Sequence, residues 1–385
     1  MKKISDQIIN SIQKCLVNKD KGHHTPNFKG NEKKYLSRCI DTTFVSYVGE
    51  FVDKFEKNIS EFTKTKFIVA TNSGSSALHL LLNYYGLGKK DEVLVPSFTY
   101  IATVNPIYYC GATPNFIDIE KDTLGVCPVK LENYLNRISF KKNGFTYNKK
   151  TKKKISALIA VHVHGFPCQI DKINKICKKF NILLIEDAAE AFGSFYKKKH
   201  LGTFGSSAIL SFNGNKIITT GSGGAVMVKS KKIADTLKHI STHAKMQSQV
   251  DSKHDRIGFN YRMSNISAAL GCAQLENIQN ILKAKRKNYH MYKKIFRKNK
   301  KIFLFKEPKG SKTNYWLISI RVENKKLKNL ILRKLRQKGY GLRSVWRPIH
   351  SLKIYKNCPR DSMENSNLIF NTTLNLPSGS KINYG

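Results

Sequence analysis

Short apolar runs alternate with amphipathic segments up to about residue 230 of the chain. FIVATNSG (67–74) is a β-branched run that ends in a glycine, and SSALHLLLNYYG (75–86) repeats apolar residues at helical spacing. Amphipathic helices are also predicted within 1–24, 44–66 and 170–181, and further strands within 91–111, 113–119, 154–165, 182–187, 208–212 and 224–228. Continuous apolar strands are typical of sheets covered on both faces, so the pattern predicts an α/β domain with a parallel or mixed sheet.

The pattern changes near residue 260. It predicts a long amphipathic helix over 263–296, a strand over 315–322, a helix over 327–339 and a strand over 342–349. We therefore expect a large domain over 1–259, including the N-terminal helical segment, and a small C-terminal α+β domain over 260–385. The lysine-rich stretch 141–154 is expected to be a surface loop.

We expect no transmembrane or secretory segment. No apolar run approaches the roughly eighteen residues that a spanning helix needs. The first residues lack the apolar core and cleavage site of a signal peptide, so we expect a cytoplasmic protein without membrane insertion. The eight cysteines are scattered, with no CxxC pair and no Cys/His cluster at zinc spacing, so we expect free thiols and no metal site.

The formal net charge of +42, from 68 Lys+Arg against 26 Asp+Glu, attracts polyanions such as nucleic acid, a membrane surface or a nucleotide-sugar pyrophosphate. The lysines are spread over nearly every predicted exposed face and form no single stripe with interleaved aromatic residues. Lys, Asn and Ile are all abundant, which favours compositional drift over specific nucleic-acid binding. The charge would still help an anionic substrate to arrive.

Two segments together predict pyridoxal phosphate (PLP) chemistry. The strand ILLIED ends in Asp187, and about thirty residues later SFNGNKIITTGSGG holds Ser211 and Lys216. Lys216 would form the Schiff base and Asp187 would keep the pyridine nitrogen protonated. The alternatives are a solvent-facing lysine and an aspartate that caps a helix. Gly74, Asp187, Ser211 and Lys216 each follow a strand, and ligands of such sheets bind outside the carboxyl ends of the strands.

Further candidates surround this pair. The strand–turn–helix at 67–86 is a phosphate cradle, with close backbone approach at Gly74 and hydroxyls from Ser75, Ser76 and Ser211. Tyr100 would stack on the PLP ring or pack in the core. Glu190 would reach the 3′-oxygen of PLP or complete a capping box. His162 and His164 follow a strand and would either line the site or lie in the core or a loop. Asn260 and Arg262 are expected where the long helix begins, and the pattern alone gives them no role.

These motifs resemble the DegT/DnrJ/StrS family of PLP-dependent nucleotide-sugar aminotransferases. The resemblance covers nearly the whole chain and rests on TNSGSSALHL, PSFTYIATVNPI, HVHGFPCQID, EDAAEAFGSFYKKKHLGTFG, SFNGNKIITTGSGG and GFNYRMSNISAALGCAQLE. It implies fold type I, the aspartate-aminotransferase-like fold. EDAAE, SFNGNKIITTG and DTTFVSYVG look most like the LegC-type enzymes, UDP-4-amino-4,6-dideoxy-N-acetylglucosamine transaminases, on the way to legionaminic acid.

The resemblance implies a role for each matching residue. Lys216 matches the Schiff-base lysine, Asp187 the pyridinium partner, Glu190 the residue near the 3′-oxygen, Tyr100 the stacking aromatic, and Ser75, Ser76 and Ser211 the phosphate ligands. Asn260 matches a residue that reaches the phosphate from the other subunit, which implies a homodimer with shared active sites. His162, His164, Arg262 and His350 are candidate substrate contacts.

The chain departs from the family pattern in places. Ser222 gives GSGG after the lysine, Ser75 stands where Thr is usual, and HVHG, which includes His164, replaces the commoner HLYG or HTFG. The end, NLPSGSKINYG, is short and is expected to lack a final helix.

The activity expected from the resemblance is transfer of an amino group from L-glutamate to the C4 keto group of a UDP-4-keto-6-deoxy-N-acetylhexosamine, for surface polysaccharide or nonulosonic acid synthesis. A 3-keto or other keto sugar is the alternative acceptor. A PLP-dependent dehydratase is disfavoured because that branch replaces the lysine, which is present here as Lys216. A basic nucleic-acid-binding or regulatory protein is the alternative from another class.

Overall fold

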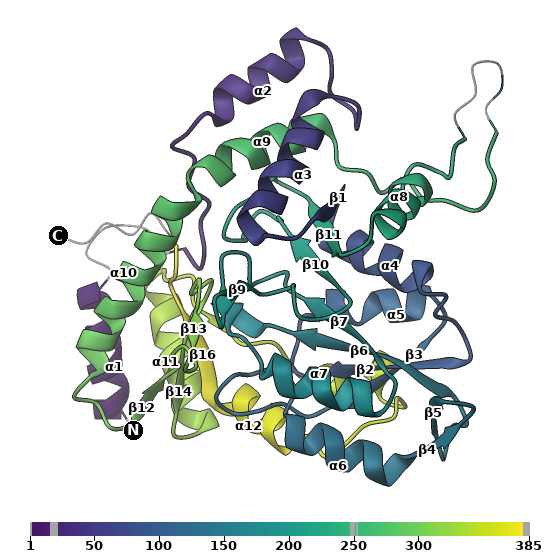
Figure 1. Cartoon of the computed structure of the whole chain (residues 1–385). Helices are drawn as coiled ribbons and strands as arrows, with labels where there is room; N and C mark the ends of the chain where they lie inside the picture. The colour runs from purple at the N-terminus through teal and green to yellow at the C-terminus, as the bar shows by residue number, and fades with distance from the viewer. Residues whose placement is uncertain (1, 16–21, 247–250, 252, 380–385) are drawn as a thin grey trace.

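The computed structural model describes residues 2–15, 22–246, 251 and 253–379 (Figure 1). A large sheet occupies the centre of the molecule. Its main strands, from one edge to the other, are β1 (Phe67–Thr71), β11 (Gly224–Val228), β10 (Ser207–Ser211), β7 (Leu183–Asp187), β6 (Lys154–Val161), β2 (Asp91–Pro96) and β3 (Thr113–Ile117). β11 runs antiparallel to both of its neighbours, and the other pairs on this path are parallel. The predicted mixed, mostly parallel sheet is confirmed.

Helices cover both faces of this sheet because each strand is apolar on both sides. On β1, Val69 packs in one core cluster with Leu78 of α4 (Gly74–Tyr84), whereas Ile68 packs in another with Phe55 of α3 (Glu50–Thr63). The first face also carries α5 (Asn105–Tyr109) and α8 (Lys231–Ile240). The second carries α6 (Pro128–Ile138), α7 (Ile170–Lys179) and α9 (Asn265–Glu276), with α2 (Glu32–Asp41) packed on α9. The result is a three-layer domain.

Within the stretch 141–154, expected to be a surface loop, most of 141–148 belongs to this sheet, whereas residues 149–153 lie in no strand. β4 (Ser139–Lys142) and β5 (Phe145–Asn148) make an antiparallel hairpin, and β5 pairs with β6 through Tyr147 and Lys154. The turn consists of Asn143 and Gly144, with φ of 50° and 77°. Asn-Gly accepts this left-handed backbone readily, so the loop prediction was wrong for a reason visible in the sequence.

The predicted helix over 263–296 is two consecutive helices, α9 and α10 (Ile278–Phe296), which meet at Asn277 (Figure 1). Ser264 caps α9 by accepting a hydrogen bond from the Ser267 amide. Asn260 and Arg262 therefore precede the helix and do not begin it.

After α10 the chain builds a second, antiparallel sheet. Its order is β12 (Ile302–Leu304), β14 (Ile318–Val322), β16 (Thr373–Leu376) and β15 (Arg343–Ser344), covered by α11 (Lys325–Gln337) and α12 (Glu364–Thr372). The strand predicted over 342–349 is thus limited to two residues. We expect the C-terminal end to be short and to lack a final helix. The structure describes this end only to residue 379, and residues 380–385 lie outside the described part of the chain.

The N-terminal helix α1 (Lys2–Cys15) packs against α10 and α11, beside the second sheet (Figure 1). Ile8, Ile9 and Ile12 are its buried face. The first residues of the chain therefore contact elements that follow residue 260. The domain boundary at 259/260 remains a prediction.

Short elements connect these parts. β8 (Phe195–Tyr196), β9 (Lys199–His200) and β13 (Ser311–Lys312) form a small sheet that joins the two domains, and the 3-10 helices are η1 (Ile101–Thr103), η2 (Val163–Gly165), η3 (Ile349–Ser351) and η4 (Lys353–Tyr355). Among the helices that the structure describes, none combines the length and apolar character needed to cross a bilayer.

Candidate active site

A cavity of about 400 Å³ opens at the carboxyl ends of the parallel strands, facing the second sheet. It brings together seven of the residues singled out in the sequence: Gly74, Ser75, Tyr100, Asp187, Glu190, Ser211 and Lys216. These residues come from segments that follow β1, β2, β7 and β10. The opposite wall includes Trp316, Arg343, Trp346 and Asn375.

Lys216 lies inside this cavity and is not a solvent-facing lysine, because only 14% of its side chain is exposed. Its Nζ is 3.6 Å from Oε1 of Glu190 and 4.1 Å from the ring centroid of Trp316. The Trp316 Nε1–H donates to the main-chain oxygen of Asn215 at 2.6 Å. The small domain thereby fixes the turn that presents the amine.

Asp187 ends β7 as a buried carboxylate. Oδ2 accepts a hydrogen bond from Thr103 Oγ1 at 2.8 Å, and Oδ1 accepts one from the Ala189 amide at 3.0 Å. The residues after it form turns and no helix, so it is not a helix cap. Burial raises the pKa of Asp187, although these hydrogen bonds oppose the shift. No described cation forms an ion pair with it, so a protonated pyridine nitrogen would supply the missing partner.

Glu190 stands between Lys216 and the loop at His164. Its Oε2 accepts a hydrogen bond from the His164 amide at 2.7 Å, across the sheet edge, and no capping box forms. Burial raises the pKa of Glu190 to about 7, with the positive charge of Lys216 opposing the shift. A carboxyl group with this pKa exchanges its proton near neutral pH, as a partner of the PLP 3′-oxygen needs to do.

The turn between β1 and α4 has the features of a phosphate cradle. Ser73 caps α4: its Oγ accepts a hydrogen bond from the Ser76 amide at 3.0 Å and lies 2.8 Å from Ser76 Oγ. The amides of Gly74 and Ser75 have no intrahelical partner, since they are the first two of the helix. A Cβ at Gly224 would lie 2.5 Å from the Gly74 nitrogen, so only glycine permits this close approach. Together with Ser211, the turn fits a bound phosphate.

Tyr100 is 55% exposed at the mouth of the cavity, which excludes a core position. Its ring centroid is 6.2 Å from that of Trp346, tilted by 52°. Its exposed position in the lining lets the ring contact a ligand that enters the cavity.

Several predicted site residues lie outside the cavity lining, and their functional roles remain predictions. Ser76 is engaged with Ser73. His350 Nδ1 lies 2.6 Å from Ser97 Oγ, and Arg262 forms a buried ion pair with Glu56 at 3.0 Å. Asn260 is exposed and accepts a hydrogen bond from Asn72 Nδ2 through its main-chain oxygen.

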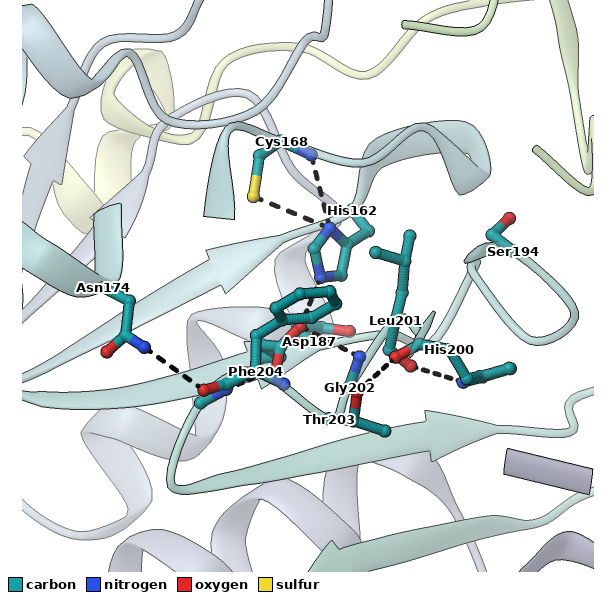
Figure 2. Close-up of polar contacts among 12 residues, drawn as sticks. His162, Cys168, Asn174, Asp187, Ser194, His200, Leu201, Gly202, Thr203 and Phe204 are labelled. Carbon is teal, nitrogen blue, oxygen red and sulfur yellow. Dashed lines mark hydrogen bonds and ion pairs between the residues drawn. The ribbon is translucent and has the colours of Figure 1, made fainter. Parts of the chain in front are cut away.

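His162 belongs to a buried network behind Asp187 (Figure 2). Its Nε2 is 2.8 Å from Oε2 of Glu186, and its amide donates to the main-chain oxygen of Asp187. Glu186 also accepts hydrogen bonds from the amides of Gly202, Phe204 and Gly205. Burial alone would lower the pKa of His162, but its contacts with Cys168 and Glu186 raise it; burial alone would raise the pKa of Glu186, but its contact with His162 lowers it. The amide hydrogen bonds to Glu186 fasten the turn after β9 to the end of β7, and His162 joins the end of β6 to the same carboxylate.

His164 is also buried but neutral. Its Nδ1 lies 3.0 Å from Ser319 Oγ, and burial, together with nearby His23 and Lys216, lowers its pKa to about 3. Since its amide binds Glu190, the residue positions that carboxyl group from behind the cavity.

Sequence reasoning missed several residues of the site: Ser73, Thr103, His23, Trp316, Arg343 and Trp346. Ser73 had a recognisable signal, since a serine before a helical run is a preferred cap. Thr103 lies three residues after Tyr100 in the PSFTYIATVNPI motif, but nothing in that motif marks its contact with Asp187. His23, Trp316, Arg343 and Trp346 reach the site from segments distant from these motifs in the chain.

Comparison with known proteins agrees with this geometry. Residues 26–384 match the model of the DegT/DnrJ/EryC1/StrS aminotransferase family. A GDP-perosamine synthase from Vibrio cholerae is 37% identical over 361 residues, which cover 92% of this chain and 93% of that protein. A UDP-4-amino-4,6-dideoxy-N-acetyl-beta-L-altrosamine transaminase from Campylobacter jejuni is 31% identical over 340 residues, covering 87% of this chain and 86% of that protein.

Among solved structures, an aminotransferase of this family from Brucella abortus superposes with a TM-score of 0.84 at 25% identity, covering 92% of this chain and 91% of that one. The reported relatives do not single out the LegC-type subgroup. The chain belongs to the DegT/DnrJ/EryC1/StrS aminotransferase family and is a PLP-dependent aminotransferase of fold type I.

Proposed function

We propose that the protein moves an amino group from L-glutamate to the C4 keto group of a UDP-4-keto-6-deoxy-N-acetylhexosamine. The observation that carries the proposal is the placement of Lys216, 3.6 Å from Glu190, in the same cavity as Asp187 and the phosphate cradle. We place the reaction in the cytoplasm, in the synthesis of surface polysaccharide or a legionaminic-type acid.

Each group has a defined task in this reaction. PLP, when bound, supplies the electron sink that makes the Cα proton of the amino donor acidic. Lys216 would hold the cofactor covalently and, once released, would take up and return that proton at Nζ. Asp187 would keep the ring nitrogen protonated, and Gly74, Ser75 and Ser211 would hold the phosphate. Glu190 would share a proton with the 3′-oxygen, and its Oε1 lies 3.6 Å from Nζ of Lys216.

A sugar nucleotide as acceptor is supported by the relatives, which include GDP-perosamine synthases and a UDP-altrosamine transaminase. The net charge of +42 favours capture of a substrate with a diphosphate. The reported GDP-perosamine synthases from Vibrio cholerae and Escherichia coli are 37% and 36% identical to this chain, above the 31% of the UDP-sugar enzyme. A GDP-linked 4-keto sugar is therefore the second candidate acceptor.

A homodimer with shared active sites completes the proposal. Asn260 is exposed and lies outside the cavity of its own chain, as expected of a residue that reaches the partner's phosphate. Exposed apolar side chains cluster between α2 and α3, at Ile40, Phe44, Val45, Tyr47 and Val48. Such a cluster is typical of a surface that another protein covers.

The direct test is a pair of half-reactions. Purified protein with PLP should show a visible absorbance band that disappears when L-glutamate is added. The aminated enzyme should then convert UDP-4-keto-6-deoxy-N-acetylglucosamine, or its GDP-linked 4-keto counterpart, to an amino sugar detected by mass spectrometry with ¹⁵N-glutamate. Lys216→Ala should remove the glutamate-dependent change and lower turnover by about 10²- to 10⁴-fold or more.

Lys231→Ala is the matched control, because Lys231 is an exposed lysine paired with Asp235. It should leave both half-reactions intact. A wild-type protein that binds PLP but transfers nitrogen to neither sugar would refute the proposed acceptors.

A further inference from the structure

One wall of the cavity comes from the N-terminal segment that follows α1. His23 lines the cavity, and its main-chain oxygen accepts a hydrogen bond from the Ser378 amide at 3.0 Å. Ser378 in turn accepts a hydrogen bond from the Ile318 amide through Oγ at 2.9 Å. The buried Lys285 donates to the main-chain oxygens of Trp316 and Ser378. These bonds tie His23 to the same framework that holds Trp316 over Lys216.

The His23 imidazole has an unmet hydrogen-bonding capacity. Its Nδ1 is buried and has no partner among the residues that the structure describes. Burial, followed by the positive charges of Arg343 and Lys285, lowers the pKa of His23 to about 4. The ring is therefore neutral at physiological pH, with one N–H to donate and one nitrogen to accept. A buried polar atom without a partner is costly unless a water or a ligand satisfies it.

Arg343 lies on the same wall, on β15 beside Asn375 of β16. Its side chain is exposed, and no described carboxylate is within ion-pair distance of its guanidinium group. The two acidic residues of the lining, Asp187 and Glu190, are buried around Lys216, and burial raises the pKa of each. The guanidinium is thus a free cation at the edge of a cavity whose carboxyl groups are engaged elsewhere.

We propose that His23 and Arg343 form a subsite for an anionic oxygen group of the substrate, either a carboxylate or a phosphoryl group. Arginine binds both groups through paired N–H donors, and the neutral imidazole adds one more donor beside it. The phosphate of PLP already has its cradle at Gly74 and Ser211, on the large domain. The subsite therefore serves the molecule that enters the cavity after the cofactor.

This inference rests on the proposed function, because it assumes that the ligand is an amino donor with carboxylates or a nucleotide sugar with a diphosphate. The two sources can be separated with unreactive probes. Glutarate carries the two carboxylates of glutamate without its amine, and UDP carries the diphosphate without the sugar. Their dissociation constants are measured by isothermal titration calorimetry on the PLP-loaded enzyme.

Arg343→Gln should weaken binding of one probe by about tenfold or more, the usual size of a charge-assisted hydrogen bond. His23→Ala should weaken the same probe by about three- to tenfold, and His23→Gln, which keeps an N–H donor, should recover part of the loss. If the variants bind only glutarate more weakly, the subsite binds the carboxylate. If they bind only UDP more weakly, the subsite binds the diphosphate.

Arg347→Gln is the matched control, because Arg347 is exposed on the same segment but does not line the cavity. Unchanged binding of both probes in Arg343→Gln and His23→Ala would overturn the subsite. A thermal melt of each variant separates loss of binding from loss of fold. Failure of the wild type to aminate any keto sugar would refute the proposed function instead, whatever the probes bind.

Discussion

Glu190 is a buried carboxyl group that changes its charge near neutral pH. Burial lifts its pKa to about 7 from a usual value near 4.5. At a pH between 4.5 and about 7, Glu190 keeps its proton in the folded protein but has lost it in the unfolded chain. The contribution of Glu190 to folding stability is therefore complete below about pH 4.5 and is lost as the pH rises through 7.

Glu190→Gln tests this prediction in the PLP-free protein, since glutamine resembles the neutral acid and does not ionise. Urea unfolding measures the free energy of unfolding at pH 4.5 and at pH 7. Between these two pH values, the free energy of unfolding of the wild type should fall by on the order of 3 kcal/mol relative to that of the variant. The same comparison with Glu132→Gln, an exposed pair partner of Lys179, should show no such difference. If the free energy of unfolding changed with pH in the same way in the wild type and in Glu190→Gln, the raised pKa of Glu190 would be contradicted.

At this scale the sequence led to Asp187 and Lys216 because Asp187 is the last residue of the apolar strand β7 and Lys216 lies five residues after the apolar strand β10. The carboxyl ends of these two strands bring both residues into one cavity. Their partners were not predictable. Thr103 reaches Asp187 from a 3-10 helix 84 residues away in the chain, and Trp316 reaches Lys216 from the other domain. Such contacts depend on packing between distant segments, which no local pattern encodes.

At the scale of elements, the approach of the β1–α4 turn to the start of β11 depends on Gly224. A Cβ there would lie 2.5 Å from Gly74 N, Ser73 C and Ser73 O. Gly224→Ala should push the phosphate cradle away from Ser211, lower PLP affinity by at least about tenfold, and destabilise the fold by about 1–3 kcal/mol. Fluorescence titration with PLP and urea unfolding measure the two effects.

Gly271→Ala is the control for Gly224→Ala. Gly271 lies on α9, where a Cβ would meet the Phe55 ring at 2.6 Å and Cγ2 of Thr220 at 2.8 Å, and none of these three residues lines the cavity. It should destabilise the fold to a similar extent and leave PLP affinity unchanged. If PLP affinity fell equally in both variants, the loss would come from the lower stability of the whole fold and not from a displaced phosphate cradle.

The elements that the sequence misjudged have physical explanations. In 139–148 the abundance of lysine concealed an Asn143-Gly144 turn between two strands, and those lysines extend into solvent from a hairpin. The break at Asn277 is invisible to periodicity, because a single residue separates α9 from α10. β16 was missed since TLNL is a short run, and its place between β14 and β15 comes from tertiary pairing.

At the scale of the whole molecule, the proposed dimer should depend on the exposed apolar cluster between α2 and α3. Val48 is 53% exposed there. Val48→Glu should shift the protein toward the monomer in sedimentation velocity and weaken PLP binding, because Asn260 would lose its partner subunit. Val129→Glu is the control: Val129 is 67% exposed on α6, remote from this cluster. A dimer that persists in Val48→Glu would exclude this surface as the interface.

The chain has two tryptophans, Trp316 and Trp346, and both line the cavity with ring centroids 6.5 Å apart. The intrinsic indole emission of the protein therefore originates entirely at the site. Any molecule that enters the cavity changes the surroundings of both fluorophores at once, with no background from elsewhere in the chain. The enzyme thus carries its own optical reporter of occupancy, and ligand entry can be followed in real time without a label.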